Sequence, residues 1–153
     1  APDQSTEGPE TLILTLESKT ASLVIADTST PPKPSDMTPP SLLSVTPSSG
    51  TKDVAVNQNM VFTFNENIAK GSGVIQLLGP GGALIESFNV QTSNRLTWIA
   101  NQLTIDPTAD LLNDQSYRIV IPNGAIDDLT GNDFAGTSIE LTTVGQAGPP
   151  PGF

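Results

Sequence analysis

Hydrophobic and polar residues alternate with a period of two along much of the chain, which is the pattern of half-buried β-strands. The clearest run is residues 59–68, NMVFTFNENI, in which Met60, Phe62 and Phe64 face one way. Similar runs predict further strands at residues 41–47, 74–78, 83–90, 95–100, 102–106, 117–122 and 138–144. The only helical candidate is one turn at residues 108–115. We therefore predict an all-β fold, a β-sandwich.

The alternation also predicts which residues fill the sandwich. Successive side chains of a strand point to opposite faces, so alternate apolar residues share the buried face. The predicted core residues are Phe62, Phe64, Leu103, Ile105, Tyr117, Ile119 and Leu141.

The N-terminal segment carries a separate pair of alternating runs, TLILTL at residues 11–16 and ASLVIAD at residues 21–27. The short sequence between them predicts a β-hairpin. A lone hairpin is marginal in water, and its aliphatic face needs a covering partner. The residues predicted to take part in assembly are Leu12, Leu14, Leu16, Leu23 and Ile25.

These patterns divide the chain into four predicted parts. Residues 1–27 form the hairpin segment, and residues 28–40 form an extended Pro-rich linker. Residues 41–144 form the sandwich, and residues 145–153 form a Pro/Gly-rich tail.

Composition narrows the possible chemistry. The 153 residues include no Cys and no His, which removes disulfides, thiol nucleophiles and the commonest general base. The net charge of −10 argues against binding to nucleic acid. No run approaches the ~20 apolar residues of a membrane-spanning helix.

Two sets of motifs in residues 41–144 resemble the Ig-like domains of bacterial surface and S-layer-type proteins. The first half has a Pro-x-x-Gly, Val-x-Val-Asn and Phe-x-Glu-like series at Pro47, Gly50, Val54, Val56, Asn57, Phe64 and Glu66. The second half has Leu-x-Ile-x-Pro, Tyr-x-Ile-x-Ile, an acidic Gly-Asn turn and a last strand, at Leu103, Ile105, Pro107, Tyr117, Ile119, Ile121, Gly124, Ile126, Asp128, Gly131, Asn132, Leu141, Thr142 and Thr143. The resemblance implies an Ig-like β-sandwich that works outside the cell.

The N-terminal segment resembles the closing hairpin of a Calx-beta domain, in which an acidic Glu-Gly-x-Glu motif precedes a Leu-rich strand. Here that motif ends at Glu10, and Asp27 is the last residue of the second run. The hairpin is then either the end of a preceding domain or an element that donates strands to a neighbour.

The acidic sequence AIDDLTGNDFAG is the main candidate for metal binding. Asp127, Asp128, Asn132 and Asp133 offer the oxygen ligands that Ca²⁺ prefers, although their spacing is not that of an EF-hand. The alternative is structural, because Asp and Asn in turns bond nearby backbone N–H groups. We interpret the turn as mainly structural, with no cofactor required and calcium as the possible ligand. Glu66 is expected to be a solvated strand end that could join such a site.

Other candidate chemistry is weaker. Asp106 and Asp110 form a carboxylate pair of the kind that glycosidases use, but no pocket motif accompanies them. The sequence around Lys70, AKGSG, lacks the phosphate-loop spacing and is expected to be a flexible connection. Trp98, the only Trp, could stack on a sugar, but a core or half-buried position is expected.

We therefore predict a non-catalytic structural or adhesive module of a bacterial surface protein, located outside the cell. Its partners would be neighbouring domains or identical subunits, with surface glycans possible. One alternative is a subunit of a filament that assembles by strand addition through the hairpin. A second is an ancillary carbohydrate-binding domain of a secreted enzyme.

Overall fold

The computed structural model describes the backbone of residues 10–16, 19–25 and 35–146, and side chains within residues 35–146. The chain divides into two compact units, residues 1–35 and 36–153. The predicted linker up to residue 34, the tail from residue 147, and Asp27 of the Calx-beta-like motif lie outside the described residues.

The first unit contains the predicted hairpin, formed by β1 (Glu10–Leu16) and β2 (Lys19–Ile25). The strands are antiparallel, with Leu12 opposite Leu23 and Leu14 opposite Ala21. Cross-strand partners occupy the same face of a sheet. The register therefore places all five predicted assembly positions on one face of the hairpin.

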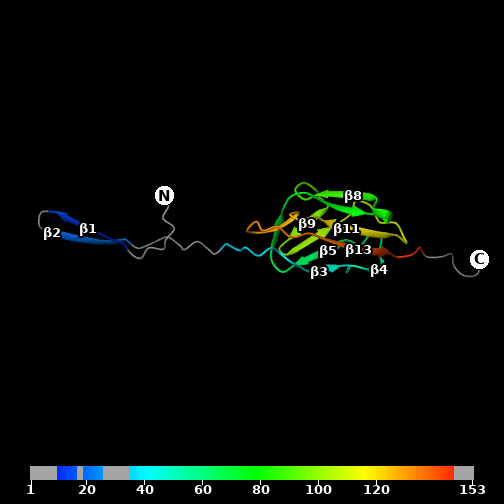
Figure 1. Ribbon diagram of the computed structural model, residues 1–153, viewed down its shortest axis with the longest axis horizontal. Coiled ribbons are helices and arrows are strands. Elements are labelled where there is room, and N and C mark those ends of the chain that lie inside the picture. The colour runs from blue at the N-terminus through cyan, green and yellow to red at the C-terminus, as the bar shows by residue number, and fades with distance from the viewer. Residues whose placement is uncertain (1–9, 17–18, 26–34, 147–153) are drawn as a thin grey trace, which may run out of the picture. The chain divides into compact units, whose positions relative to one another are not determined.

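The second unit is a sandwich of two main sheets (Figure 1). The four-stranded sheet has the order β3 (Leu42–Thr46), β5 (Met60–Phe64), β10 (Gln102–Ile105) and β9 (Leu96–Ile99). The five-stranded sheet has the order β4 (Thr51–Val54), β13 (Thr137–Thr143), β11 (Ser116–Ile121), β7 (Val74–Leu78) and β8 (Leu84–Asn89). The chain crosses between sheets after β3, so that β4 pairs in parallel with β13. The prediction of an all-β, Ig-like sandwich is confirmed.

One hydrophobic core joins the two sheets. The predicted inward phase of β5 is confirmed, because Met60, Phe62 and Phe64 are fully buried while Val61 and Thr63 are partly exposed. Every residue predicted for the core is at most 4% exposed, namely Phe62, Phe64, Leu103, Ile105, Tyr117, Ile119 and Leu141.

Two local predictions are wrong. The expected flexible connection around Lys70 includes β6 (Ile68–Lys70), which pairs with β12 (Ile126–Asp128) inside the expected acidic loop. Both strands are three residues long, too short to show a period. The expected helical turn at residues 108–115 is irregular, and a single 3-10 turn, η1 (Pro80–Gly82), forms between β7 and β8 instead.

A hydrogen bond from the backbone fixes the turn before β11. The buried Tyr117 stands at the start of this strand, and its hydroxyl accepts a 2.8 Å hydrogen bond from the N–H of Leu112. This arrangement is the tyrosine corner of Ig-like sandwiches, in which the hydroxyl bonds the backbone a few residues upstream. It holds the loop between β10 and β11 against the core.

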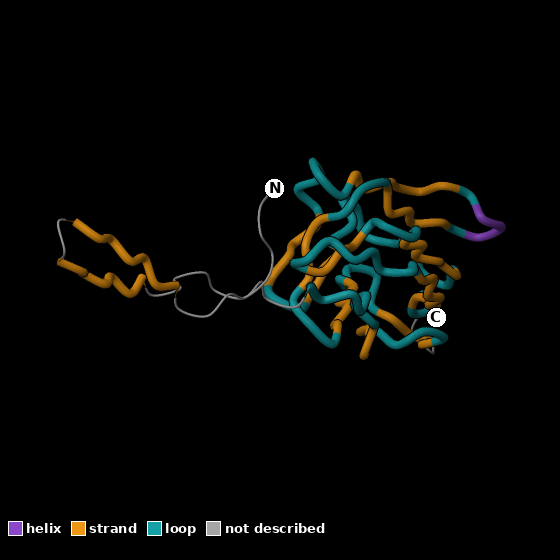
Figure 2. The backbone as a smooth tube through the Cα atoms, turned by 60° about the vertical axis from the view of Figure 1, so that its left-hand side comes forward, coloured by secondary structure: helices purple, strands orange, loops and turns teal. Residues whose placement is uncertain are grey.

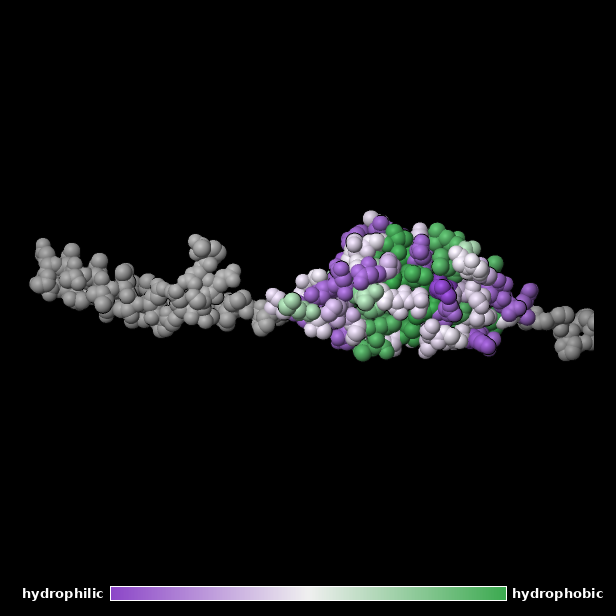
Figure 3. Space-filling view, viewed as in Figure 1, coloured by the Kyte–Doolittle hydropathy of each residue, from purple (hydrophilic) through white to green (hydrophobic). Residues whose placement is uncertain are grey.

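The polypeptide joins the sandwich at one end and leaves it at the other, as Figures 1 and 2 both show. At the N-terminal end, the carbonyl of Asp36 accepts a 2.8 Å hydrogen bond from the side-chain amide of Asn132. At the C-terminal end, the N–H of Val144 donates to Val54 and its carbonyl accepts from Asp114. Figure 3 shows hydrophobic atoms over the middle of the face in view and mostly hydrophilic atoms toward both ends.

Candidate functional site

The acidic turn at the N-terminal end is built around Asp128, the last residue of β12. This residue is 3% exposed, and its carboxylate accepts backbone hydrogen bonds of 2.8 Å from Thr130 and 2.8 Å from Asn132. The side chains of the same two residues donate to it as well, Thr130 Oγ1 at 2.9 Å and Asn132 Nδ2 at 2.7 Å. Gly131, between them, has φ of 90°, a conformation that favours glycine.

These hydrogen bonds determine the charge state of Asp128. Burial alone would raise the pKa of its carboxyl, but the hydrogen bonds from Asn132 and Thr130 together hold that pKa far below its usual value. The two carboxylate oxygens offer about four lone-pair directions, and the surrounding donors already use them. Asp128 therefore acts here as the centre of a hydrogen-bonded turn.

Two more carboxylates approach Asp128 from distant parts of the chain. One oxygen each from Asp36, Glu66 and Asp128 lies within 4.8 Å of the others. Burial raises the pKa of Glu66, and the negative charges of Asp36 and Asp128 raise it further. Glu66, expected as a strand end that could join the acidic turn, is partly exposed and lies beside the two other acids. Asp128 already accepts four hydrogen bonds, and Oδ1 of Asp36 accepts one from the N–H of Thr38. A divalent cation here would therefore rely mainly on the remaining oxygens of Asp36 and Glu66.

Asp127 and Asp133 lie apart from this cluster. Their backbones pair as an isolated antiparallel β-bridge. Because Asp127 and Asp128 are neighbours on β12, their side chains point to opposite faces of this strand. Burial raises the pKa of Asp127, and the neighbouring charge of Asp133 adds to the effect. Oδ1 of Asp127 is buried without a hydrogen-bond partner, close to Gly71. The four residues expected as one ligand set are thus divided between two environments.

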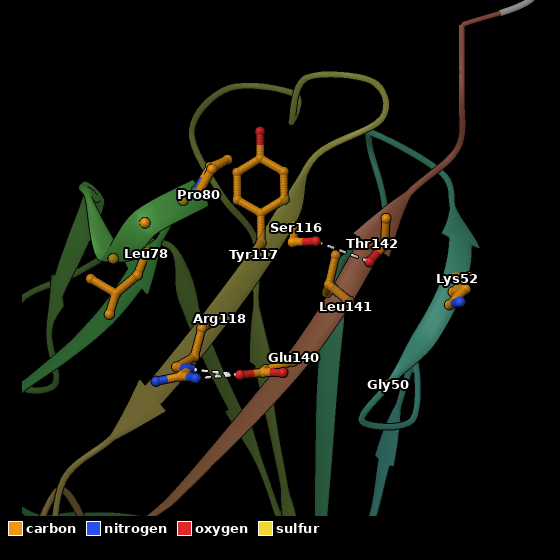
Figure 4. A pocket seen from close by; sticks show the side chains of 13 residues that line it. Gly50, Lys52, Leu78, Pro80, Ser116, Tyr117, Arg118, Glu140, Leu141 and Thr142 are labelled. Carbon is orange, nitrogen blue, oxygen red and sulfur yellow. Dashed lines mark hydrogen bonds and ion pairs between the residues drawn. The ribbon is translucent and has the colours of Figure 1, made fainter.

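A groove of about 580 Å³ crosses the outer face of the five-stranded sheet near the C-terminal end (Figure 4). Its floor carries an ion pair between Arg118 on β11 and Glu140 on β13, and a 3.3 Å contact between the hydroxyls of Ser116 and Thr142. Residues 79–82 form one wall, and Lys52 of β4 lies at the opposite side. The sequence analysis missed this groove, because polar residues alternating on an outer strand face look like an ordinary solvated surface.

Two other residues considered for chemistry from the sequence are engaged in contacts within the sandwich. Asp106, expected as one of a carboxylate pair, makes a 3.4 Å ion pair with Arg95. Trp98 is half-buried on β9 and packs against the core, as expected. Its Nε1 is buried without a hydrogen-bond partner among the described residues.

Comparison with known proteins agrees with this fold. Residues 36–143 match the sequence profile of a family described as bacterial Ig-like domain. The crystal structure of CopC from Methylosinus trichosporium OB3b superposes with a TM-score of 0.53 at 16% identity, covering 71% of this chain and 97% of that chain. This likeness concerns the fold alone. No curated protein matches the sequence. Within the described residues, no helix has the length and apolar character needed to cross a membrane.

Proposed function

The chain belongs to the bacterial Ig-like domain family, and from this premise we propose that it is a non-catalytic structural module of an adhesive bacterial surface protein. It lies outside the cytoplasm, at the cell surface, where it spaces and displays the parts on either side of it. An Ig-like domain fits such a role, because its binding or spacing function resides in surfaces and ends carried by a rigid core.

The two points where the polypeptide enters and leaves the sandwich support this proposal most directly. The polypeptide joins the Ig-like sandwich at one end and leaves at the other (Figure 1). Each point is tied to the body of the domain, through Asp36 at one end and Val144 at the other. A domain held in this way keeps its neighbours at a fixed separation.

A distance measurement tests the spacing role. The chain has no cysteine, so Thr38→Cys and Gly145→Cys would place fluorophores at two exposed positions near the two ends. We expect one narrow distance distribution that does not change with calcium, chelator or added glycans. A broad distribution, or a distance that shifts with one of these additions, would contradict a passive spacer.

A second candidate is a filament subunit that assembles by strand addition. The observation in its favour is the β1–β2 hairpin, a two-stranded sheet in a unit of its own. Two isolated strands are marginally stable in water and gain stability from a neighbouring sheet. Deleting residues 1–27 should then abolish concentration-dependent assembly and leave a folded monomer. Unchanged assembly after the deletion would remove this candidate.

A further inference from the structure

We propose that the groove at the C-terminal end binds the acidic turn of a second copy of this chain, so that copies associate head to tail. The acidic turn here means residues 127–133, and the groove is the one walled by residues 79–82 and Lys52. The inference extends the proposed spacing function, because it gives successive copies a defined contact.

The groove concentrates positive charge in an acidic protein. Of the four cationic side chains in residues 35–146, Lys52 and Arg118 line it. Arg118 is paired with Glu140, whereas the ion pairs of this described region leave Lys52 without a carboxylate partner. The groove therefore carries one uncompensated positive charge, while the chain as a whole has a net charge of −10.

The acidic turn offers the complementary surface. Leu129 in this turn has 69% of its surface exposed, and the carboxylates beside it that solvent can reach are those of the exposed Asp133 and the half-buried Asp127. An apolar tip flanked by carboxylates suits a groove in which the apolar Leu78 and Pro80 lie beside Lys52 and Arg118. Charge complementarity of this kind sets orientation and speeds encounter.

The placement of the two surfaces determines the form of the assembly. The turn binds Asp36 at the N-terminal end, and the groove lies beside Ser116 and Thr142 at the C-terminal end (Figure 4). Because the surfaces differ and lie at opposite ends, the contact is heterologous and extends into an open line of copies. A closed two-fold dimer is not expected.

Charge exchange in the full-length chain tests the contact. On concentration to about 1 mM, a range that detects weak association, the wild type should show amide NMR shifts at the turn and at Gly79, Gly81, Gly82 and Ser116. Lys52→Glu and Leu129→Lys should each weaken self-association at least ~10-fold by placing like charges together. An equal mixture of the two variants should associate again, because the new lysine then meets the new glutamate.

Leu43→Lys is the matched control, since Leu43 is 66% exposed on β3, a strand of the four-stranded sheet that contributes no residue to the groove or to the turn. It should leave association unchanged, and dispersed amide spectra should confirm that every variant is folded. The proposal is wrong if the wild type stays monomeric, if the control weakens association as much as Leu129→Lys, or if the mixture fails to recover. Association that survives both variants but needs residues 1–27 would assign assembly to the hairpin. The internal distance between the labelled ends tests spacing independently of all these outcomes.

Discussion

Replacing Tyr117 with Phe isolates the hydrogen bond of the tyrosine corner. The substitution keeps the buried ring and opens no cavity, because only the hydroxyl is lost. The N–H of Leu112, which donates to that hydroxyl at 2.8 Å, then has no protein acceptor. The variant therefore measures what this one bond contributes to folding.

The expected cost follows from the surroundings of the bond. A typical hydrogen bond contributes about 0.5–1.5 kcal/mol net, and a buried donor left unsatisfied costs about 1–3 kcal/mol. The expected cost of losing this bond lies between these two ranges. The bond itself is part-buried, but the Leu112 side chain is 70% exposed, so the N–H is close to solvent. We expect the free energy of unfolding to fall by about 1–2 kcal/mol. For a domain of this size that corresponds to a fall in Tm of roughly 4–10 °C.

Urea unfolding provides the measurement. The midpoint should move to lower urea with an unchanged m-value, because the surface exposed on unfolding stays the same. Leu112→Ala is the control, since it keeps the N–H and alters an exposed side chain, and it should change stability by less than ~0.5 kcal/mol. If Tyr117→Phe is equally silent, the corner bond does not stabilise the native state and the reasoning fails.

Three further predictions concern the core and the acidic cluster. Phe62→Ala should lower the free energy of unfolding by about 3–5 kcal/mol, measured by denaturant titration, and a loss under ~1 kcal/mol would contradict its place in the core. EDTA should leave Tm unchanged, because the carboxylate oxygens of Asp128 already accept hydrogen bonds from within the turn. A large fall reversed by calcium would make the acidic residues ligands. Because folding raises the pKa of Glu66, the protonated Glu66 carboxyl favours the folded state. This contribution to stability is present below the ordinary pKa of 4.5 and is lost as pH rises through the folded-state pKa. Glu66→Gln should therefore raise Tm at pH 7, and the variant should gain less Tm than the wild type when the pH is lowered. A variant that is less stable than the wild type in calcium would contradict this.

The strands that the sequence predicts well are those with several alternating residues on a buried face. Phe62 and Phe64 on β5, and Tyr117 and Ile119 on β11, show the period of two because each strand has one side in the core. The strands β6 and β12 were missed for the opposite reason. Three residues contain too few alternations, and their pairing depends on tertiary contacts.

The candidate site could be predicted only in part. The bonding role of Asp128 follows from the local chemistry of an Asp-x-x-Gly-Asn turn, which needs no distant residue. The approach of Asp36 does not, because this residue lies in a Pro-rich segment without periodicity. The sequence raised the possibility that Glu66 joins the turn, but whether it does depends on where the end of β5 lies in the fold. The groove is harder still to predict from the sequence. It forms because η1 and β4 lie on either side of an outer sheet face whose polar residues are ordinary.

The parallel pairing of β4 with β13 has a mechanical consequence. Tension applied where the polypeptide enters and leaves the sandwich draws β4 toward the N-terminal end and β13 toward the C-terminal end. Two backbone hydrogen bonds join this pair at its opposite ends, from Gly50 N–H to the Glu140 carbonyl and from Val144 N–H to the Val54 carbonyl. Both bonds are then perpendicular to the applied force and are loaded together in shear. Rupture should occur as one event when the chain is stretched between Thr38 and Gly145 by force spectroscopy. Peeling of β13 at low force would show that the load is taken bond by bond.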